Sequence, residues 1–325
     1  MKKIIPYAIE AYHHSKKSIL GFITFLVAIW GMFNFFLSQK LGWYVLSMLA
    51  IFGFIFAFMK YSFWFYHIVK GRMTVPVFGK RETTLLRNDF QKNMDLMLHD
   101  LSSDELEKFA FIMGIDRTGK LDISSTGGVV YSVLKYLNTN YMCEEQCPVD
   151  FIQQVIDKKM ETLLAKGKEH DLDYGVCIEV KMKLQSIHNT ESISIIPCNL
   201  ILIANSRKED PKDKNLEERM TDDNQSNIIV PKVFDYLLKT NWYGGAMIGV
   251  MGTNGMGQSY QVIFSQIINQ FARICYKDKH CPLYHLYISI READYSRSDM
   301  SLSHLEKYVR QCAEYYSTWN SNTTL

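Results

Sequence analysis

The order of apolar and polar residues divides the chain into two unlike parts. Residues 18–38 are 21 consecutive positions without an ionisable side chain, and a second apolar run covers residues 43–59. A helix needs roughly 20 apolar residues to cross the bilayer core, and it satisfies its own backbone amides, as lipid requires. We therefore expect a transmembrane hairpin in residues 1–72, with spans at about 18–38 and 43–67, and a soluble domain in residues 73–325.

Basic residues flank the two spans and are nearly absent from the turn between them. Those outside the turn are Lys2, Lys3, Lys16, Lys17, Lys60, Lys70 and Arg72. Only Lys40 lies in the turn. The positive-inside bias therefore predicts that both termini and the soluble domain are cytoplasmic. The alternative is that the hairpin is the buried apolar core of a soluble protein.

Beyond residue 72, short apolar runs alternate with amphipathic segments. We expect strands at residues 75–78, 83–86, 109–115, 176–184, 193–205, 245–252 and 283–290. We expect helices at residues 88–101, 127–137, 149–166, 231–239, 259–276 and 301–316. Runs that are apolar throughout, such as residues 109–115, are typical of strands buried on both faces. The alternation predicts an α/β sandwich around a central sheet.

Composition excludes some classes of function. A formal net charge of +2 with 22% charged residues carries no footprint for nucleic acid. The seven cysteines are scattered, which fits a reducing compartment without disulfides. A metal site would have to draw on Cys143, Cys147, Cys275, His280, Cys281 and His285. Since the chain has no CxxC pair, we expect neither a metal nor a cofactor.

Two glycine-bearing turns each join an expected strand to an expected helix. The first turn includes Asp116, Arg117, Thr118, Gly127 and Gly128, and Val129 follows it. The second turn is Gly252, Thr253, Asn254, Gly255, Met256 and Gly257. Amides at a helix N-terminus bind anions such as a diphosphate, and such sites lie at the carboxyl ends of strands. The alternative is that the glycines only mark tight turns.

Two other nucleotide-binding patterns fit less well. Residues 114–120 match the first seven positions of a Walker A loop, but Leu121 occupies the position of the magnesium-binding Ser or Thr. A phosphoribosyltransferase needs an acidic pair directly after a buried strand, whereas Asp222 and Asp223 lie in a polar segment. Neither class is favoured.

The order of the motifs resembles a macro domain, the α/β/α module that binds ADP-ribose. The resemblance rests on FIMGID, the following GGV at residues 127–129, GTNGMG at residues 252–257 and the last strand LYHLYISI. It implies a three-layer fold with a mixed central sheet and an ADP-ribose derivative as the ligand. It also implies that Asp89 reads the adenine and that Tyr295 lies over the ligand. The other implied ligand-binding residues are those of the two turns and Val129.

The sequence departs from macro domains that hydrolyse ADP-ribose linkages. Those domains carry an asparagine-rich segment where this chain has Gly114, Ile115, Asp116 and Arg117. Many also carry an Asp after GGV, where this chain has Val130. We therefore expect binding without turnover and no catalytic residues, with a membrane-bound ADP-ribosylhydrolase as an alternative.

Two spans before a macro domain resemble the membrane effector of type II Thoeris antiphage defence. The resemblance implies a TIR-domain partner enzyme that makes a histidine-linked ADP-ribose signal. It also implies a homo-oligomer that disrupts the bacterial inner membrane, with Asn34 in the first span available for helix contacts. The alternative is a two-span receptor for a cyclic nucleotide in a related defence system.

Overall fold

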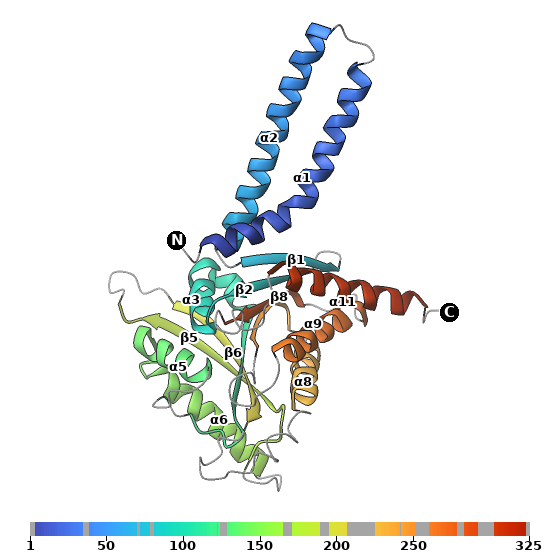
Figure 1. Cartoon of the computed structure of the whole chain (residues 1–325). Coiled ribbons are helices and arrows are strands. Elements are labelled where there is room, and N and C mark those ends of the chain that lie inside the picture. Colours follow the sequence, from blue (N-terminus) through green and yellow to red (C-terminus); the bar gives the residue numbers. More distant parts are fainter. Residues whose placement is uncertain are drawn as a thin grey trace. The chain divides into compact units, whose positions relative to one another are not determined.

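The computed structural model divides the chain into two compact units (Figure 1). One unit is residues 1–73 with 300–307, and the other is residues 74–299 with 308–325. The structure describes residues 4–34, 39–69, 72–78, 81–121, 123, 129–164, 171–188, 195–206, 225–240, 242–250, 260–277, 283–291 and 302–322.

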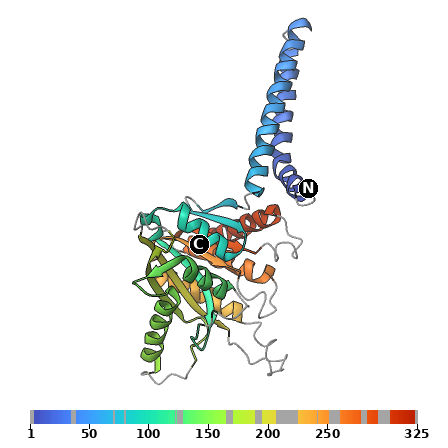
Figure 2. The ribbon, with the colours of Figure 1, turned by 90° about the vertical axis from the view of Figure 1, so that its left-hand side faces the viewer.

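The first unit contains a pair of long apolar helices, α1 (Ile4–Asn34) and α2 (Gln39–Val69). They run side by side in both views (Figure 1 and Figure 2), with the rings of Phe22 and Phe56 stacked at 4.1 Å between centroids. Ala11–Met32 and Leu41–Tyr66 are long and apolar enough to cross a membrane. The helix α1 begins at Ile4, well before the expected span, and it includes Lys16 and Lys17.

The second unit is built on an eight-stranded sheet of order β1-β2-β8-β7-β3-β6-β5-β4. The strands are β1 (Arg72–Phe78), β2 (Arg81–Arg87), β3 (Phe109–Asp116), β4 (Tyr141–Cys143), β5 (Cys177–Ser186), β6 (Ile195–Ser206), β7 (Gly244–Gly249) and β8 (Leu283–Ile290). From β2 to β6 neighbouring strands are parallel, whereas β5 is antiparallel to both β6 and β4. The expected α/β class with a mixed sheet is therefore confirmed.

Helices lie on both faces of this sheet, with α5 and α6 on one side and α8 and α9 on the other (Figure 1). The helices that follow the hairpin are α3 (Phe90–Asp100), α4 (Ser103–Leu106), α5 (Val129–Asn140), α6 (Pro148–Leu164), α8 (Gln225–Lys239), α9 (Tyr260–Lys277) and α11 (Leu302–Asn322). Phe111 of β3 belongs to a buried cluster with Val133 of α5 and Ile152 of α6. Because strand side chains alternate between faces, Ile112 points to the opposite side, toward the layer of α8 and α9. The sheet is thus buried on both faces, which explains its apolar strands.

Several expected boundaries are wrong. The helix α8 begins at Gln225, so Pro231 lies inside it rather than at its start. Pro231 removes one helix hydrogen bond, but Ile229 and Val230 before it are buried together with Phe234, and this burial extends the helix. The strand β7 ends at Gly249 instead of residue 252, and α11 runs to Asn322 instead of residue 316. The short strand β4 was not expected.

Candidate functional site

The five parallel strands all end at one edge of the sheet, called the carboxyl edge below. The last residues of these strands are Arg87 of β2, Ile290 of β8, Gly249 of β7, Asp116 of β3 and Ser206 of β6. In open α/β sheets, ligands bind outside the carboxyl ends of parallel strands, where connections leave to opposite faces. Neighbouring strands β3 and β7 meet that condition, because β3 leads to α5 on one face and β7 leads to α9 on the other.

A tight turn shapes the carboxyl edge directly after β3. The Asp116 carboxylate accepts a hydrogen bond from the Thr118 amide at 2.8 Å, and the Gly119 amide donates to the Asp116 carbonyl at 3.0 Å. Gly119 has a φ of +68°, and a Cβ there would lie 2.5 Å from Met160 Sδ. This glycine is therefore required by the turn and by the approach of α6.

Gln153 of α6 holds the segment that follows this turn. Its Nε2 donates to the Gly119 carbonyl at 2.9 Å, and its Oε1 accepts from the Leu121 amide at 2.8 Å. The side chain therefore replaces two backbone partners that an irregular segment otherwise lacks. No local pattern in the sequence points to Gln153, because it lies 32 residues after Leu121.

The side chain of Arg117 contacts a second segment, which contains Leu172 and Tyr174. Its Nε donates to the Leu172 carbonyl at 2.6 Å, and the Leu172 amide donates to the Arg117 carbonyl at 2.8 Å. Its guanidinium lies 4.1 Å above the centre of the Tyr174 ring. The structure thus gives Arg117 a role in packing, and its expected contact with a ligand stays a prediction.

Gly114, which opens the Walker-like match, is explained by packing within the sheet. A Cβ at Gly114 would lie 2.8 Å from Asn205 Nδ2 on the neighbouring strand β6. Packing and turn geometry thus account for both Gly114 and Gly119 without a phosphate. This agrees with the sequence argument against a Walker A loop.

Asp89 lies on the carboxyl edge at the other side of the parallel strands. It is the exposed N-cap residue of α3, and its side chain makes no capping hydrogen bond. The preceding Asn88 amide donates to the Ile290 carbonyl at 2.7 Å, so this segment adjoins the end of β8. Two strands separate β2 from β3, so the ends of these two strands lie about 14 Å apart across the edge. The edge is wide enough for an elongated ligand.

Phe90 connects α3 with the exit of β7. A Cβ at Gly249 would lie 3.0 Å from the Phe90 ring, and that ring is buried. The amide of Val250 donates to the Ser289 carbonyl at 3.3 Å, which keeps the chain beside β8 as it leaves the sheet. The segment that follows Val250 therefore starts on the carboxyl edge.

Most of the expected ligand-binding residues lie outside the described residues. These are Gly127, Gly128, Gly252, Thr253, Asn254, Gly255, Met256 and Gly257, and Tyr295 is among them too. Their described flanks are Val129, the first residue of α5, and Val250, directly after β7. The expected site residues that the structure does describe at the carboxyl edge are Asp89, Asp116, Arg117, Thr118 and Val129.

Four of the described cysteines are poor nucleophiles. Burial raises the pKa of the Cys177 thiol to about 12, and burial also raises the pKa of Cys143, Cys198 and Cys312. A thiol with a raised pKa carries little thiolate at neutral pH. Among the described residues, no three His, Cys, Asp or Glu side chains gather as metal ligands do.

No known sequence family and no curated protein matches the chain. Solved structures of similar fold include the Oceanobacillus iheyensis macrodomain with ADP, with 10% identity, a TM-score of 0.42 and coverage of 73% of this chain and 97% of that one. The same macrodomain with MES bound has 9% identity, a TM-score of 0.41 and coverage of 77% of this chain and 98% of that one. Poly(ADP-ribose) glycohydrolase from Deinococcus radiodurans in complex with ADP-ribose has 8% identity, a TM-score of 0.34 and coverage of 71% of this chain and 83% of that one. These likenesses concern the path of the chain and assign no activity.

Proposed function

We propose that the carboxyl edge between β3 and β7 binds an ADP-ribose derivative. The observation that carries this proposal is the pair of neighbouring parallel strands whose connections lead to α5 and α9 on opposite faces. Each connection contains glycines that allow close backbone approach. The amides at the starts of the two helices are suited to the diphosphate, because a helix N-terminus favours an anion.

The proposed ligand extends along the edge from this diphosphate. The exposed carboxylate of Asp89 can accept hydrogen bonds, as the exocyclic amino group of adenine requires. The separation of about 14 Å between the ends of β2 and β3 matches a long ligand better than a single phosphate. The resemblance in motif order to macro domains supports the same class of ligand.

We propose binding without turnover. The Asp116 carboxylate at the site already accepts the Thr118 amide at 2.8 Å, and the buried thiols are protonated at neutral pH. The chain has Val130 where many hydrolases of the resembling family carry an Asp. A membrane-bound hydrolase is the competing function that the experiment below must exclude.

At the level of the cell, we propose a membrane-anchored effector of a nucleotide-signalled antiphage defence. Two apolar helices support the anchor, and the distribution of lysines supports a cytoplasmic soluble domain at the bacterial inner membrane. By its resemblance to Thoeris effectors, the signal is a histidine-linked ADP-ribose made by a TIR enzyme. Binding shifts the chain toward oligomers that disrupt the membrane, which requires that the ligand bind the assembled state more tightly.

The test is calorimetry on the full chain in detergent with ADP-ribose, ADP and a cyclic dinucleotide, followed by chromatography of each nucleotide. Incubation of the chain with an ADP-ribosylated protein in the same buffer tests for hydrolase activity. The proposal expects saturable heat with ADP-ribose, none with the cyclic dinucleotide, and intact substrates. Binding of the cyclic dinucleotide alone would favour the competing receptor, and released ADP-ribose would establish an enzyme.

A further inference from the structure

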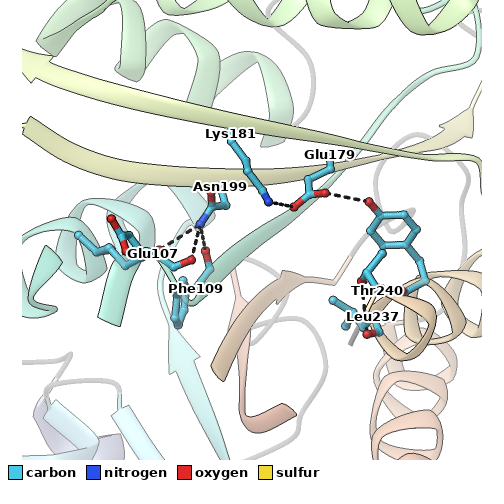
Figure 3. Close-up of polar contacts among 9 residues, drawn as sticks. Glu107, Phe109, Glu179, Lys181, Asn199, Leu237 and Thr240 are labelled. Carbon is cyan, nitrogen blue, oxygen red and sulfur yellow. Dashed lines mark hydrogen bonds and ion pairs between the residues drawn. The ribbon is translucent and has the colours of Figure 1, made fainter. Parts of the chain in front are cut away.

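The hairpin of β5 and β6 extends past the start of β3, at the end of the sheet opposite the carboxyl edge. Ala110 of β3 pairs with Asn199 of β6, so residues 195–198 of β6 lie beyond β3. The chain of α4 lies there instead, fastened by Asn199. Its Nδ2 donates to the carbonyls of Leu106, Glu107 and Phe109 at 3.1, 3.1 and 3.2 Å (Figure 3).

One face of this extension carries exposed side chains. The helix α8 covers β5 as far as Glu179, which accepts a hydrogen bond from Tyr236 Oη at 3.3 Å (Figure 3). Beyond Glu179 we define the outer face by the residues Met142, Lys181, Lys183, Gln185, Ile187, Ile195 and Pro197. Gln185 is in register with both Met142 and Ile195, so these two apolar side chains share one face of the sheet.

The apolar side chains of the outer face are exposed. Ile195 is 53% exposed, Ile187 44% and Met142 41%, and they lie on three neighbouring chain segments. Grouped apolar side chains at a sheet edge mark contact surfaces or aggregation sites. The short strand β4 is the edge strand beside them.

Charges of opposite sign lie on the two sides of Asn199, four residues along β6 from Ile195. Lys181 and Lys183 lie on the β5 side. Lys181 is in register with Asn199 and forms an ion pair with Glu179 of its own chain at 3.2 Å (Figure 3). On the other side of Asn199 lie the exposed Asp104 and Glu107, at α4 and just after it. A two-fold axis through the apolar area would bring the lysines of one copy opposite the acids of the other, as an isologous interface requires.

We propose that the outer face is the contact surface of a two-fold homodimer. Its middle is the apolar group around Ile195, and its rim pairs Lys181 and Lys183 with Asp104 and Glu107 of the second copy. This inference is independent of the proposed ligand, because the outer face and the carboxyl edge lie at opposite ends of β6.

The test is mass photometry of the full chain in detergent, with and without ADP-ribose. Ile195→Asp should weaken dimerisation at least tenfold, whereas Ile228→Asp, at an exposed position on α8, should leave it unchanged. The pair K181E and K183E should also weaken it, and adding Asp104→Lys and Glu107→Lys should restore it. Far-UV circular dichroism checks that each variant is folded.

The inference is overturned if the wild-type chain is monomeric in both conditions. It is also overturned if Ile195→Asp leaves the masses unchanged, or if the fourfold charge exchange fails to restore what K181E and K183E remove. Calorimetry with ADP-ribose on Ile195→Asp separates the two proposals, because the variant that has lost the dimer should still show saturable binding at the carboxyl edge.

Discussion

At the scale of single residues, Gln153 is the side chain on which the shape of the carboxyl edge depends most directly. We expect Gln153→Ala to weaken ADP-ribose binding several-fold, because the segment after β3 loses its bonds at Gly119 and Leu121. The loss of these hydrogen bonds should cost about 1–2 kcal/mol of stability. Calorimetry and thermal denaturation of the full chain measure the two effects.

The neighbouring Gln154 provides the control. Its exposed side chain bonds only the side chain of Gln146 among the described contacts, at 3.0 Å. Gln154→Ala should leave both binding and stability within error of the wild type. Equal loss of affinity in both variants would show that Gln153 has no special role at the site.

Cys177 gives the protein a dependence of stability on alkaline pH. Burial raises the pKa of its thiol to about 12, above the value of about 8.5 in an unfolded chain. The folded state therefore keeps a proton that the unfolded state loses, and this stabilisation is complete at neutral pH. It should fall as pH rises from about 8.5 toward 12, by at most about 1.4 kcal/mol per pH unit.

Comparison with Cys177→Ala isolates this effect. Between pH 7.5 and 10.5, the melting temperature of the wild type should fall further than that of the variant. Cys147→Ala, which removes an exposed thiol, should follow the wild-type curve. Parallel curves for the wild type and Cys177→Ala would refute the assignment.

At the scale of elements, the sequence predicted most strands and helices because their apolar periods are long. The run at residues 109–115 became β3, and the run at residues 283–290 became β8 with the same bounds. The strand β4 has three residues, which is too few to show an alternation. Its existence depends on pairing with β5, a contact that no local pattern records.

The candidate site was predictable only in part for the same reason. The turn after β3 was visible from its glycines, and the structure places Asp116 and Thr118 in it. The partners that hold this turn come from α6 and from the segment at Leu172, and both are remote in the sequence. The sequence suggested Arg117 as a ligand residue. In the structure its guanidinium lies over the ring of Tyr174, a contact with a remote residue that no local pattern records.

Asn199 is the connection that keeps α4 beside β6. Its Nδ2 has two hydrogens shared among three carbonyl acceptors, and the residue is 5% exposed. Asn199→Ala should destabilise the domain by about 2 kcal/mol, because buried carbonyl groups lose their donor. Asn140→Ala, which removes one bond within α5, should cost clearly less. Similar melting temperatures for the two variants would contradict this account.

At the scale of the whole molecule, the positive-inside bias predicts a defined orientation of the hairpin. Lys40 lies in the first turn of α2 and not in the connection that the sequence suggested, and it should face the periplasm. The exposed Cys147 of the soluble domain should face the cytoplasm. A membrane-impermeant maleimide applied to intact spheroplasts should therefore label Lys40→Cys but not the wild-type chain. Labelling of the wild-type chain should appear only after lysis, and its labelling in intact spheroplasts would reverse the orientation.

The central claim is that the carboxyl edge between β3 and β7 is the ligand site, and hydrogen–deuterium exchange with and without ADP-ribose tests it most directly. The account predicts slower exchange in residues 116–121, at the start of α5 and in the segment after Val250. Exchange in residues 181–187 should not change unless dimerisation changes with it. Saturating ADP-ribose that leaves all segments of the carboxyl edge unprotected, or protects only segments elsewhere, would contradict the account.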